Sequence, residues 1–171
     1  MRQEHKLFNT LEGFLGSVPR TTIENLEFRI DLHTLLAKDT GAQNVYLAMC
    51  LDAPQLAFDT LFWTYNPQKD AGERNQPFVL RPAQIPAVNT LHDGMLKGYD
   101  VGLDKSRKMG ASEICAKLGL LQCLLVPETH GIIGSRKKEY VDNRGDPTTL
   151  FAKIDYAYEH LPTWIKRQYT I

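Results

Sequence analysis

The sequence has few cysteines and no recognisable pattern of metal ligands. Its 171 residues include three cysteines, Cys50, Cys115 and Cys123. Cys115 and Cys123 lie eight positions apart on one expected helix, about 12 Å along its axis, which is too far for a disulfide. The five histidines are scattered, without an H-E-x-x-H or similar pair. These absences predict reduced, buried thiols and argue against a structural metal.

Long apolar runs and net charge are also absent. No apolar run approaches the ~20 residues that span a bilayer, and residues 1–6 lack the apolar core of a signal peptide. The sequence therefore predicts a cytoplasmic protein with no membrane partner. Lys+Arg and Asp+Glu both number 20, so no overall field attracts DNA, and any contact with nucleic acid has to be local.

The composition that remains is that of an ordinary globular protein. Hydrophobic residues make up 43% and charged residues 23% of the chain. At this length we expect one domain, or one domain preceded by a lead-in segment.

Residues 1–65 carry helical periodicity. We expect a short helix within residues 1–20, then an amphipathic helix from Thr22, as N-cap, to Asp39, and further helices at about 42–51 and 53–63. The apolar face of the second helix repeats near period 3.6 at Ile23, Leu26, Ile30, Leu32, Leu35 and Leu36. The aromatic residues at helical spacing are expected to pack in the core rather than to stack on bases: Phe58, Phe62, Trp63 and Tyr65.

A polar, glycine-containing stretch at residues 66–76 reads as a loop and as a boundary. It separates a helical lead-in, residues 1–70, from a second part, residues 77–171. In that part a helix is expected after Gln84 to about residue 97 and another from Ile114 to Leu125, ended by Pro127. A last helix is expected from Asp146, as N-cap, with Pro147 at its first position.

Two short segments of the second part read as strands. Tyr99, Val101 and Leu103 alternate with polar residues and glycine, and residues 130–134 form a second apolar stretch. With the helix between them they predict a parallel β-α-β unit. The expected fold class is therefore α/β, a helical lead-in followed by a partial P-loop NTPase core.

The stretch Asp104–Glu113, between the first expected strand and the helix that follows it, reads as a phosphate-binding loop. In the usual pattern, G-x-x-x-x-G-K-[ST], backbone N–H groups cradle phosphates and the hydroxyl binds Mg²⁺. Gly110 and Ser112 hold the last glycine and the hydroxyl, whereas Lys105 and Ala111 stand where the first glycine and the lysine are expected. Lys105 or Arg107 would supply the missing charge. An ordinary basic loop with Ser112 as a helix N-cap is the alternative.

Several stretches together resemble the large terminase subunit of tailed bacteriophages and prophages, the motor that packages DNA. They occur in the family's order over roughly residues 58–165, and they are residues 62–67, 77–80 with Gln84, 105–112, 134–142, 144–147, 150–151 and 159–162.

The resemblance implies a hydrolase with a deviant Walker A loop that binds ATP and Mg²⁺. Lys105 and Arg107 would contact phosphate, and Ser112 would hold Mg²⁺. Gln84 would read the adenine edge. Ser106, Gly110 and Ala111 complete the implied loop, and Ser135 and Arg136 receive no definite role. In the full-length context the implied partners are double-stranded DNA and the portal or the small terminase subunit.

The sequence also departs from that family. Asp104 places a negative charge beside the phosphate cations, and Gly102 weakens the preceding strand. The family's Walker B strand with its Asp-Glu pair, and its nuclease domain, have no counterpart here, since the apolar run at 124–128 ends in a proline-terminated helix. We therefore expect negligible ATP hydrolysis by this chain alone, and we expect it to be the N-terminal part of a longer protein or a truncated prophage reading frame.

Two other functions fit the sequence. The first is a non-catalytic interaction module that binds another packaging subunit through its helical lead-in. The second is a nucleic-acid binder with a local basic patch, formed by Lys105, Arg107, Lys108, Arg136, Lys137 and Lys138.

Overall fold

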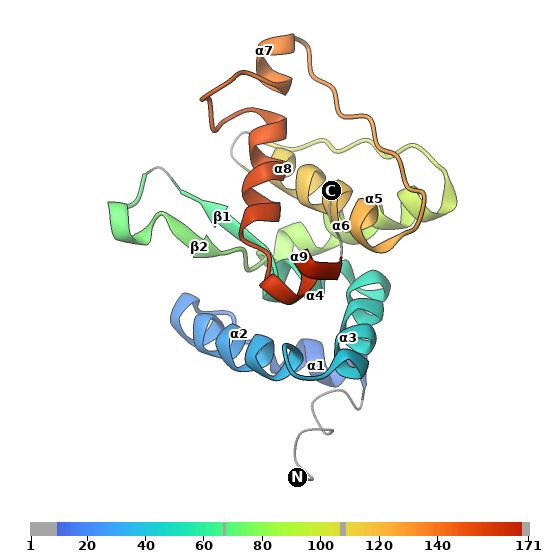
Figure 1. Ribbon diagram of the computed structural model, residues 1–171. Helices are drawn as coiled ribbons and strands as arrows, with labels where there is room; N and C mark the ends of the chain where they lie inside the picture. Colours follow the sequence, from blue (N-terminus) through green and yellow to red (C-terminus); the bar gives the residue numbers. More distant parts are fainter. Residues whose placement is uncertain (1–9, 67, 107–108, 169–171) are drawn as a thin grey trace. The chain divides into compact units, whose positions relative to one another are not determined.

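The computed structural model, drawn in Figure 1, describes residues 10–66, 68–106 and 109–168. The chain divides into two compact units, Met1–Leu80 and Arg81–Ile171. The structure is mixed α/β and mostly helical. Within the described residues its sheet is a two-stranded antiparallel hairpin.

The first unit contains four helices followed by the hairpin. Its elements are α1 (Leu11–Ser17), α2 (Thr22–Leu36), α3 (Thr40–Asp52), α4 (Pro54–Thr60), β1 (Trp63–Tyr65), the 3₁₀ turn η2 (Ala71–Glu73) and β2 (Asn75–Pro77). Thr10 Oγ1 accepts the Gly13 N–H at the start of α1, and Asp39 Oδ1 accepts the Ala42 N–H at the start of α3, both at 3.1 Å. These side chains satisfy amide groups that a helix leaves open.

A buried arginine of α2 holds the end of α4. The Arg29 side chain is 3% exposed, and its Nη2 and Nη1 donate to Phe58 O at 3.0 Å and Phe62 O at 2.9 Å. Its Nε donates to Asn25 Oδ1 at 2.7 Å, and the guanidinium lies 5.7 Å from the centre of the Trp63 ring. Burial lowers the pKa of Arg29 to about 10, so the group stays charged at neutral pH.

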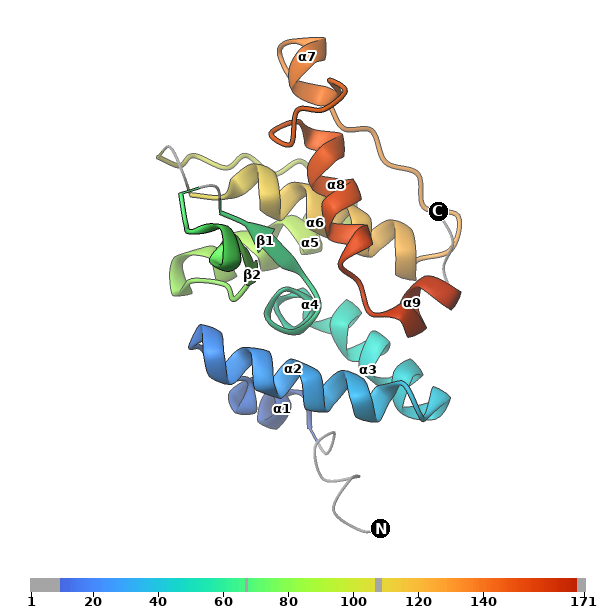
Figure 2. The same cartoon turned by 60° about the vertical axis from the view of Figure 1, so that its left-hand side comes forward.

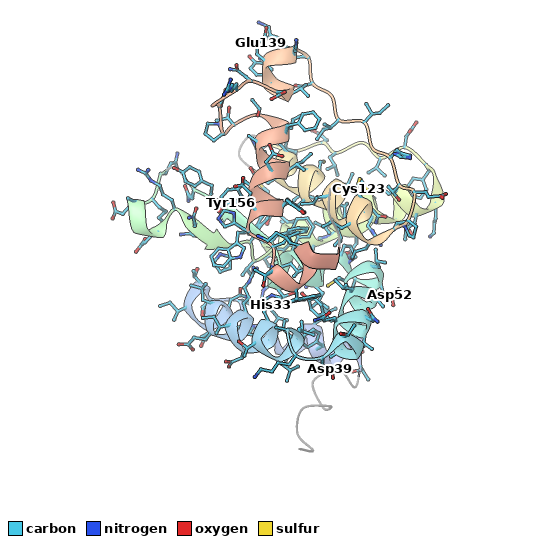
Figure 3. The ribbon with its side chains drawn as sticks, viewed as in Figure 1. His33, Asp39, Asp52, Cys123, Glu139 and Tyr156 are labelled. Carbon is cyan, nitrogen blue, oxygen red and sulfur yellow. The ribbon has the colours of Figure 1, made fainter. Side chains whose placement is uncertain are left out.

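Two more polar side chains of α2 bind the same stretch of backbone. Asn25 Nδ2 donates to Asp59 O at 3.0 Å, and His33 Nε2 lies 2.9 Å from Thr60 O. His33 is labelled on α2 in Figure 3. With Arg29, these residues recur every four positions and form one stripe along the helix. The stripe supplies donors to carbonyl groups that the short α4 cannot satisfy itself.

Asp59 ties residue 80 to the middle of the unit. Its carboxylate, 1% exposed, accepts the Leu80 N–H at 2.7 Å and pairs with the Arg20 guanidinium, which also donates to Leu80 O. The hairpin register, Trp63 opposite Pro77 and Tyr65 opposite Asn75, leads the chain back to this point. Leu80, the last residue of the unit, is thus held through both its backbone N–H and its backbone carbonyl.

The second unit is helical in its described residues (Figure 2). Its elements are the 3₁₀ turn η3 (Pro82–Gln84), α5 (Ile85–Lys97), α6 (Ala111–Leu125), α7 (Lys138–Val141), α8 (Leu150–Glu159) and α9 (Thr163–Gln168). α6 packs against α5 and, more extensively, against α8. Its apolar side chains are buried, among them Ile114, Leu118 and Leu121. Short α7 interrupts a long irregular connection between α6 and α8 (Figures 1 and 2).

The two predicted strands of the second unit are not formed. Residues 99–103 and 130–134 have no regular secondary structure, so the described residues contain no parallel β-α-β unit. The residues of the first segment bond instead to the end of α5. Tyr99 N–H donates to Gly94 O at 3.2 Å, and Tyr99 OH donates to Asp93 Oδ2 at 2.7 Å. In the second segment Ile132 is fully exposed. An isolated extended segment gains nothing without a strand to pair with.

The helices largely confirm the sequence pattern, but several details differ. Thr21, and not Thr22, is the N-cap of α2, and the helix expected at 53–63 ends at Thr60. The short helices α7 and α9 were not predicted. Ile23 and Ile30 of α2 are exposed, because the inner face carries the polar stripe. Tyr65 is exposed on a hairpin edge rather than buried in a helix. α8 begins at Leu150 with Thr149 as its N-cap, because the Asp146 carboxylate is engaged by Thr148 in a preceding turn.

No helix in the described parts of the chain is both long and apolar enough to cross a membrane.

The burial of His33 predicts a pH dependence of stability. Burial lowers its pKa to about 4, so the neutral ring is favoured in the folded state. The unfolded chain, with a histidine pKa near ~6.5, binds the proton first, and the free energy of unfolding falls as the pH drops from about 6.5 to about 4, by up to about 3 kcal/mol. Burial raises the pKa of Asp59, whose protonation acts in the opposite direction.

Urea unfolding between pH 7 and pH 4 measures this effect. The variant His33→Gln should lose the histidine part of the pH dependence, whereas His130→Gln, at an exposed position of the second unit, should keep it. Identical pH profiles for the wild type and His33→Gln would contradict the assignment.

Candidate functional site

The candidate site begins where α5 ends. Gly98 has φ +72° and its N–H donates to Gly94 O at 2.9 Å, which closes the helix. A Cβ on Gly94 would lie 2.6 Å from Val101 Cγ2, so the chain packs closely over the last turn of α5 before it leads to the loop. This local packing occupies the residues whose alternation had predicted a strand.

Of the predicted loop residues, Asp104, Lys105 and Ser106 are exposed and have no regular secondary structure. Arg107 and Lys108 lie outside the described residues. Lys105 has no ion pair among the described residues, and its side chain is free to meet an anion from solvent.

Gln84 holds the end of the loop. Its side chain is buried, Nε2 donates to Met109 O at 3.0 Å and Oε1 accepts the Arg81 N–H at 2.8 Å. The structure thus brings together Gln84 and the predicted loop, 25 positions apart. It does so with both ends of the amide bound to the chain's own backbone, which does not fit the predicted role of reading an adenine edge.

Gly110 forms the turn into α6. Its φ of +77° is in the left-handed region, and an added Cβ would lie 3.1 Å from Gln84 Nε2. Both observations require a glycine at this position. The turn therefore depends on a residue without a side chain and on the amide that packs against it.

The first turn of α6 is open. Gly110 is its N-cap residue and no side chain caps the helix, so Ser112 lies inside the first turn and is not the N-cap. The first backbone hydrogen bond of α6 joins the Ile114 N–H to Gly110 O at 3.0 Å. The N–H groups of Ala111, Ser112 and Glu113 have no partner among the described residues. They point out of the end of a helix of 15 residues, where its dipole attracts negative charge.

A charged cluster lies just behind this turn. Glu113 pairs with Lys117, whose side chain is fully buried, and its other oxygen lies 4.0 Å from Lys153 Nζ of α8. Burial lowers the pKa of Lys117, and the Glu113 carboxylate opposes that shift. The cluster joins α6 to α8 and carries one more positive than negative charge. Sequence reasoning missed it, although the i, i+4 spacing of Glu113 and Lys117 was a usable signal.

The charge of the chain is unevenly divided between the units. Residues 1–80 contain seven Lys and Arg against ten Asp and Glu, a formal charge of −3, and residues 81–171 contain thirteen against ten, a formal charge of +3. The zero net charge of the whole sequence conceals this difference. The unit that holds the loop is the basic one, which favours an anionic ligand there.

Ser135 and Arg136 do not join this site through any contact among the described residues. Both are exposed on the connection that leads to α7, where the Arg136 guanidinium lies 5.2 Å from the centre of the Tyr140 ring. The prediction of buried thiols holds for Cys50 but is wrong for Cys123, which is exposed on α6 and is labelled in Figure 3. Among the described residues no three His, Cys, Asp or Glu side chains lie close enough to hold a metal ion.

No protein-family model, no curated protein and no solved structure matches this chain.

Gly110 and Gly119 provide a matched test of the turn. Gly110→Ala should destabilise the chain by about 1–2 kcal/mol, because it forces a side chain into the left-handed region and against Gln84. Gly119→Ala, within α6 and with nothing within 4 Å of its added Cβ, should instead stabilise the helix by up to about 1 kcal/mol. Thermal and urea unfolding measure both changes. Equal effects of the two substitutions would show that Gly110 is not under conformational constraint.

Proposed function

We propose that the loop of residues 104–112 and the first turn of α6 bind the phosphates of ATP with Mg²⁺, in the N-terminal part of a terminase-like DNA-packaging ATPase. The observation that carries this proposal is the uncapped, glycine-led N-terminus of α6, tethered by Gln84 to the loop that brings Lys105.

The residues of the turn suit a polyphosphate. Three backbone N–H groups point the same way from a long helix, as in sites where peptide amides hold phosphate oxygens. Ser112 is exposed in this turn, so its hydroxyl is available to Mg²⁺. Lys105 would add charge from the exposed part of the loop. Arg107 and Ala111 belong to the same proposed contact surface.

Two carboxylates oppose the binding of an anion. Asp104 adjoins Lys105 in the sequence, and Glu113 lies in the first turn of α6. Glu113 is largely compensated by Lys117 and Lys153, whereas Asp104 has no ion pair among the described residues. We therefore propose that the chain binds ATP with modest affinity and that most of this affinity comes from contacts with the phosphates.

The proposed P-loop fold requires strands that the described residues do not form. In the terminase family, which the sequence resembles, a Walker B strand and its acids complete the sheet and activate water. We propose that residues 99–103 and 130–134 become strands only when such a strand pairs with them. Phosphate binding at a helix N-terminus does not need the sheet, but hydrolysis needs the acid. The proposed activity of this chain alone is nucleotide binding without turnover, and binding of DNA, the portal or a small subunit is proposed for the assembled motor.

Thermal unfolding with Mg-ATP tests the binding. At an ATP concentration about tenfold above Kd, a single site should stabilise the chain by about 1.4 kcal/mol and raise the Tm by several degrees. The double variant Lys105→Ala, Arg107→Ala should lose this shift. The double variant Lys137→Ala, Lys138→Ala removes the same charge at exposed positions outside residues 104–112 and should keep the shift. Ser112→Ala should abolish the additional effect of Mg²⁺ only.

A Tm that ATP leaves unchanged at millimolar concentration would contradict the proposal. An equal loss of the shift in both double variants would attribute it to general electrostatic attraction rather than to the loop.

The role of Gln84 distinguishes phosphate recognition from base recognition. Because its amide is bound to Met109 O and Arg81 N–H, we expect ATP and GTP to bind within about threefold of each other. Gln84→Ala should weaken both nucleotides to the same extent, since it releases the turn. Isothermal titration measures both affinities. A loss of ATP affinity alone would restore Gln84 as an adenine-reading residue.

A further inference from the structure

The outer face of α2 exposes two large aliphatic side chains. Ile23 is 73% and Ile30 is 64% exposed, and they stand seven positions apart on a helix of 15 residues. Seven residues are nearly two turns, so both side chains lie on one face. Isolated exposed aliphatic residues are common, but two in line on one rigid helix form a defined apolar stripe.

These isoleucines are not needed by the core of their own unit. The inner face of α2 is occupied by Asn25, Arg29 and His33, which bind backbone carbonyls, and by buried Leu32 and Leu36. Rotating the helix to bury Ile23 and Ile30 would remove the donors from those carbonyls. The apolar stripe therefore stays outside because of the bonds made on the opposite side.

Within α2, the exposed charged residues beside the stripe are all acidic. Glu24, Glu27 and Asp31 are exposed on the same side of α2, and none of them forms an ion pair with a described residue. Glu24 accepts a hydrogen bond from the Thr21 hydroxyl at 2.6 Å. The cation of this helix, Arg29, is buried on the inner side. We refer to Ile23, Glu24, Glu27, Ile30 and Asp31 as the acidic-isoleucine face.

We propose that the acidic-isoleucine face is a docking surface for an amphipathic helix of another protein, with aliphatic residues at seven-residue spacing flanked by lysine or arginine. The aliphatic residues would cover Ile23 and Ile30, and the flanking cations would meet the three carboxylates, as in paired helices with charged residues beside an apolar seam. A second copy of this chain would bring three more carboxylates against the same face, and like charges oppose that contact.

A pair of synthetic three-heptad peptides tests the proposal on the full chain. Both carry leucine at the first and fourth positions of each heptad, and one has lysine and the other glutamate beside the leucines. Fluorescence anisotropy should show binding of the lysine peptide and at least tenfold weaker binding of the glutamate peptide. The triple variant Glu24→Lys, Glu27→Lys, Asp31→Lys should reverse this preference.

A matched variant separates the proposed face from general attraction. Asp52→Lys, Asp70→Lys, Glu73→Lys makes the same change of charge at exposed positions of the same unit, and should retain the preference for the lysine peptide. Asp52 is labelled on α3 in Figure 3. Ile23→Ser, Ile30→Ser should weaken binding of the lysine peptide at least tenfold without lowering the Tm.

Several results would overturn the proposal. Equal loss of binding in the two triple variants would mean non-specific attraction, and failure of the lysine peptide to bind would leave no docking surface of this kind. A dimer in sedimentation that Ile23→Ser, Ile30→Ser dissociates would assign the face to a second copy. A Tm lowered by several degrees in that variant would show that the chain itself covers the face.

Discussion

The backbone carbonyls at the end of α4 impose the constraint on which the first unit depends. α4 has seven residues, and a helix leaves its last four carbonyls without partners. In a buried environment each unpaired carbonyl costs about 1–3 kcal/mol. The structure meets this cost with three donors spaced four residues apart on α2. Few other side chains would serve, because the sites require long or planar donors that reach across a helix interface.

That solution determines what the remaining residues of α2 do. The stripe of Asn25, Arg29 and His33 places polar atoms in the interior, so part of the apolar surface of the helix is left outside. The pKa values follow from the same arrangement. Burial lowers that of His33 to about 4 and that of Arg29 to about 10, and only the latter remains charged at neutral pH. The interior of this unit thus carries a permanent charge held by carbonyl dipoles.

In the second unit, too, a buried polar side chain binds a backbone carbonyl that is distant in the sequence. The Gln84 amide joins the turn before α5 to the turn before α6. It fits there because Gly110 has no side chain that would meet it. The result is an open helix N-terminus in the basic half of the molecule, with a cluster of Glu113, Lys117 and Lys153 immediately behind it. The phosphate site that we propose here would rely on backbone groups and the placement of the turn. It would not require a sheet, whereas the proposed hydrolysis in the assembled motor requires an acid from elsewhere.

The sequence by itself determined most of the helices, because their periodicity and end signals are local. The helix of residues 111–125 ends two residues before Pro127, which had predicted its end, and Phe58 and Phe62 are in the core as their spacing indicated. It also drew attention to Gln84 and Gly110, though not to the bond between them. The strand predicted from the alternation at residues 99–103 was wrong, since Tyr99 and Val101 pack on α5. A strand needs a partner strand, and the local pattern does not show whether one is present.

Only the tertiary structure decided which side of each helix faces inward and which polar groups are buried together. Periodicity had assigned Ile23 and Ile30 to the inner face of α2. In the structure Asn25, Arg29 and His33 occupy that face, because they bind the backbone carbonyls of residues 58–62. The division at Leu80 likewise separated an acidic from a basic half that the neutral total had hidden. Both outcomes arise from groups distant in the sequence, because an unpaired polar group becomes costly only after folding has removed water from it.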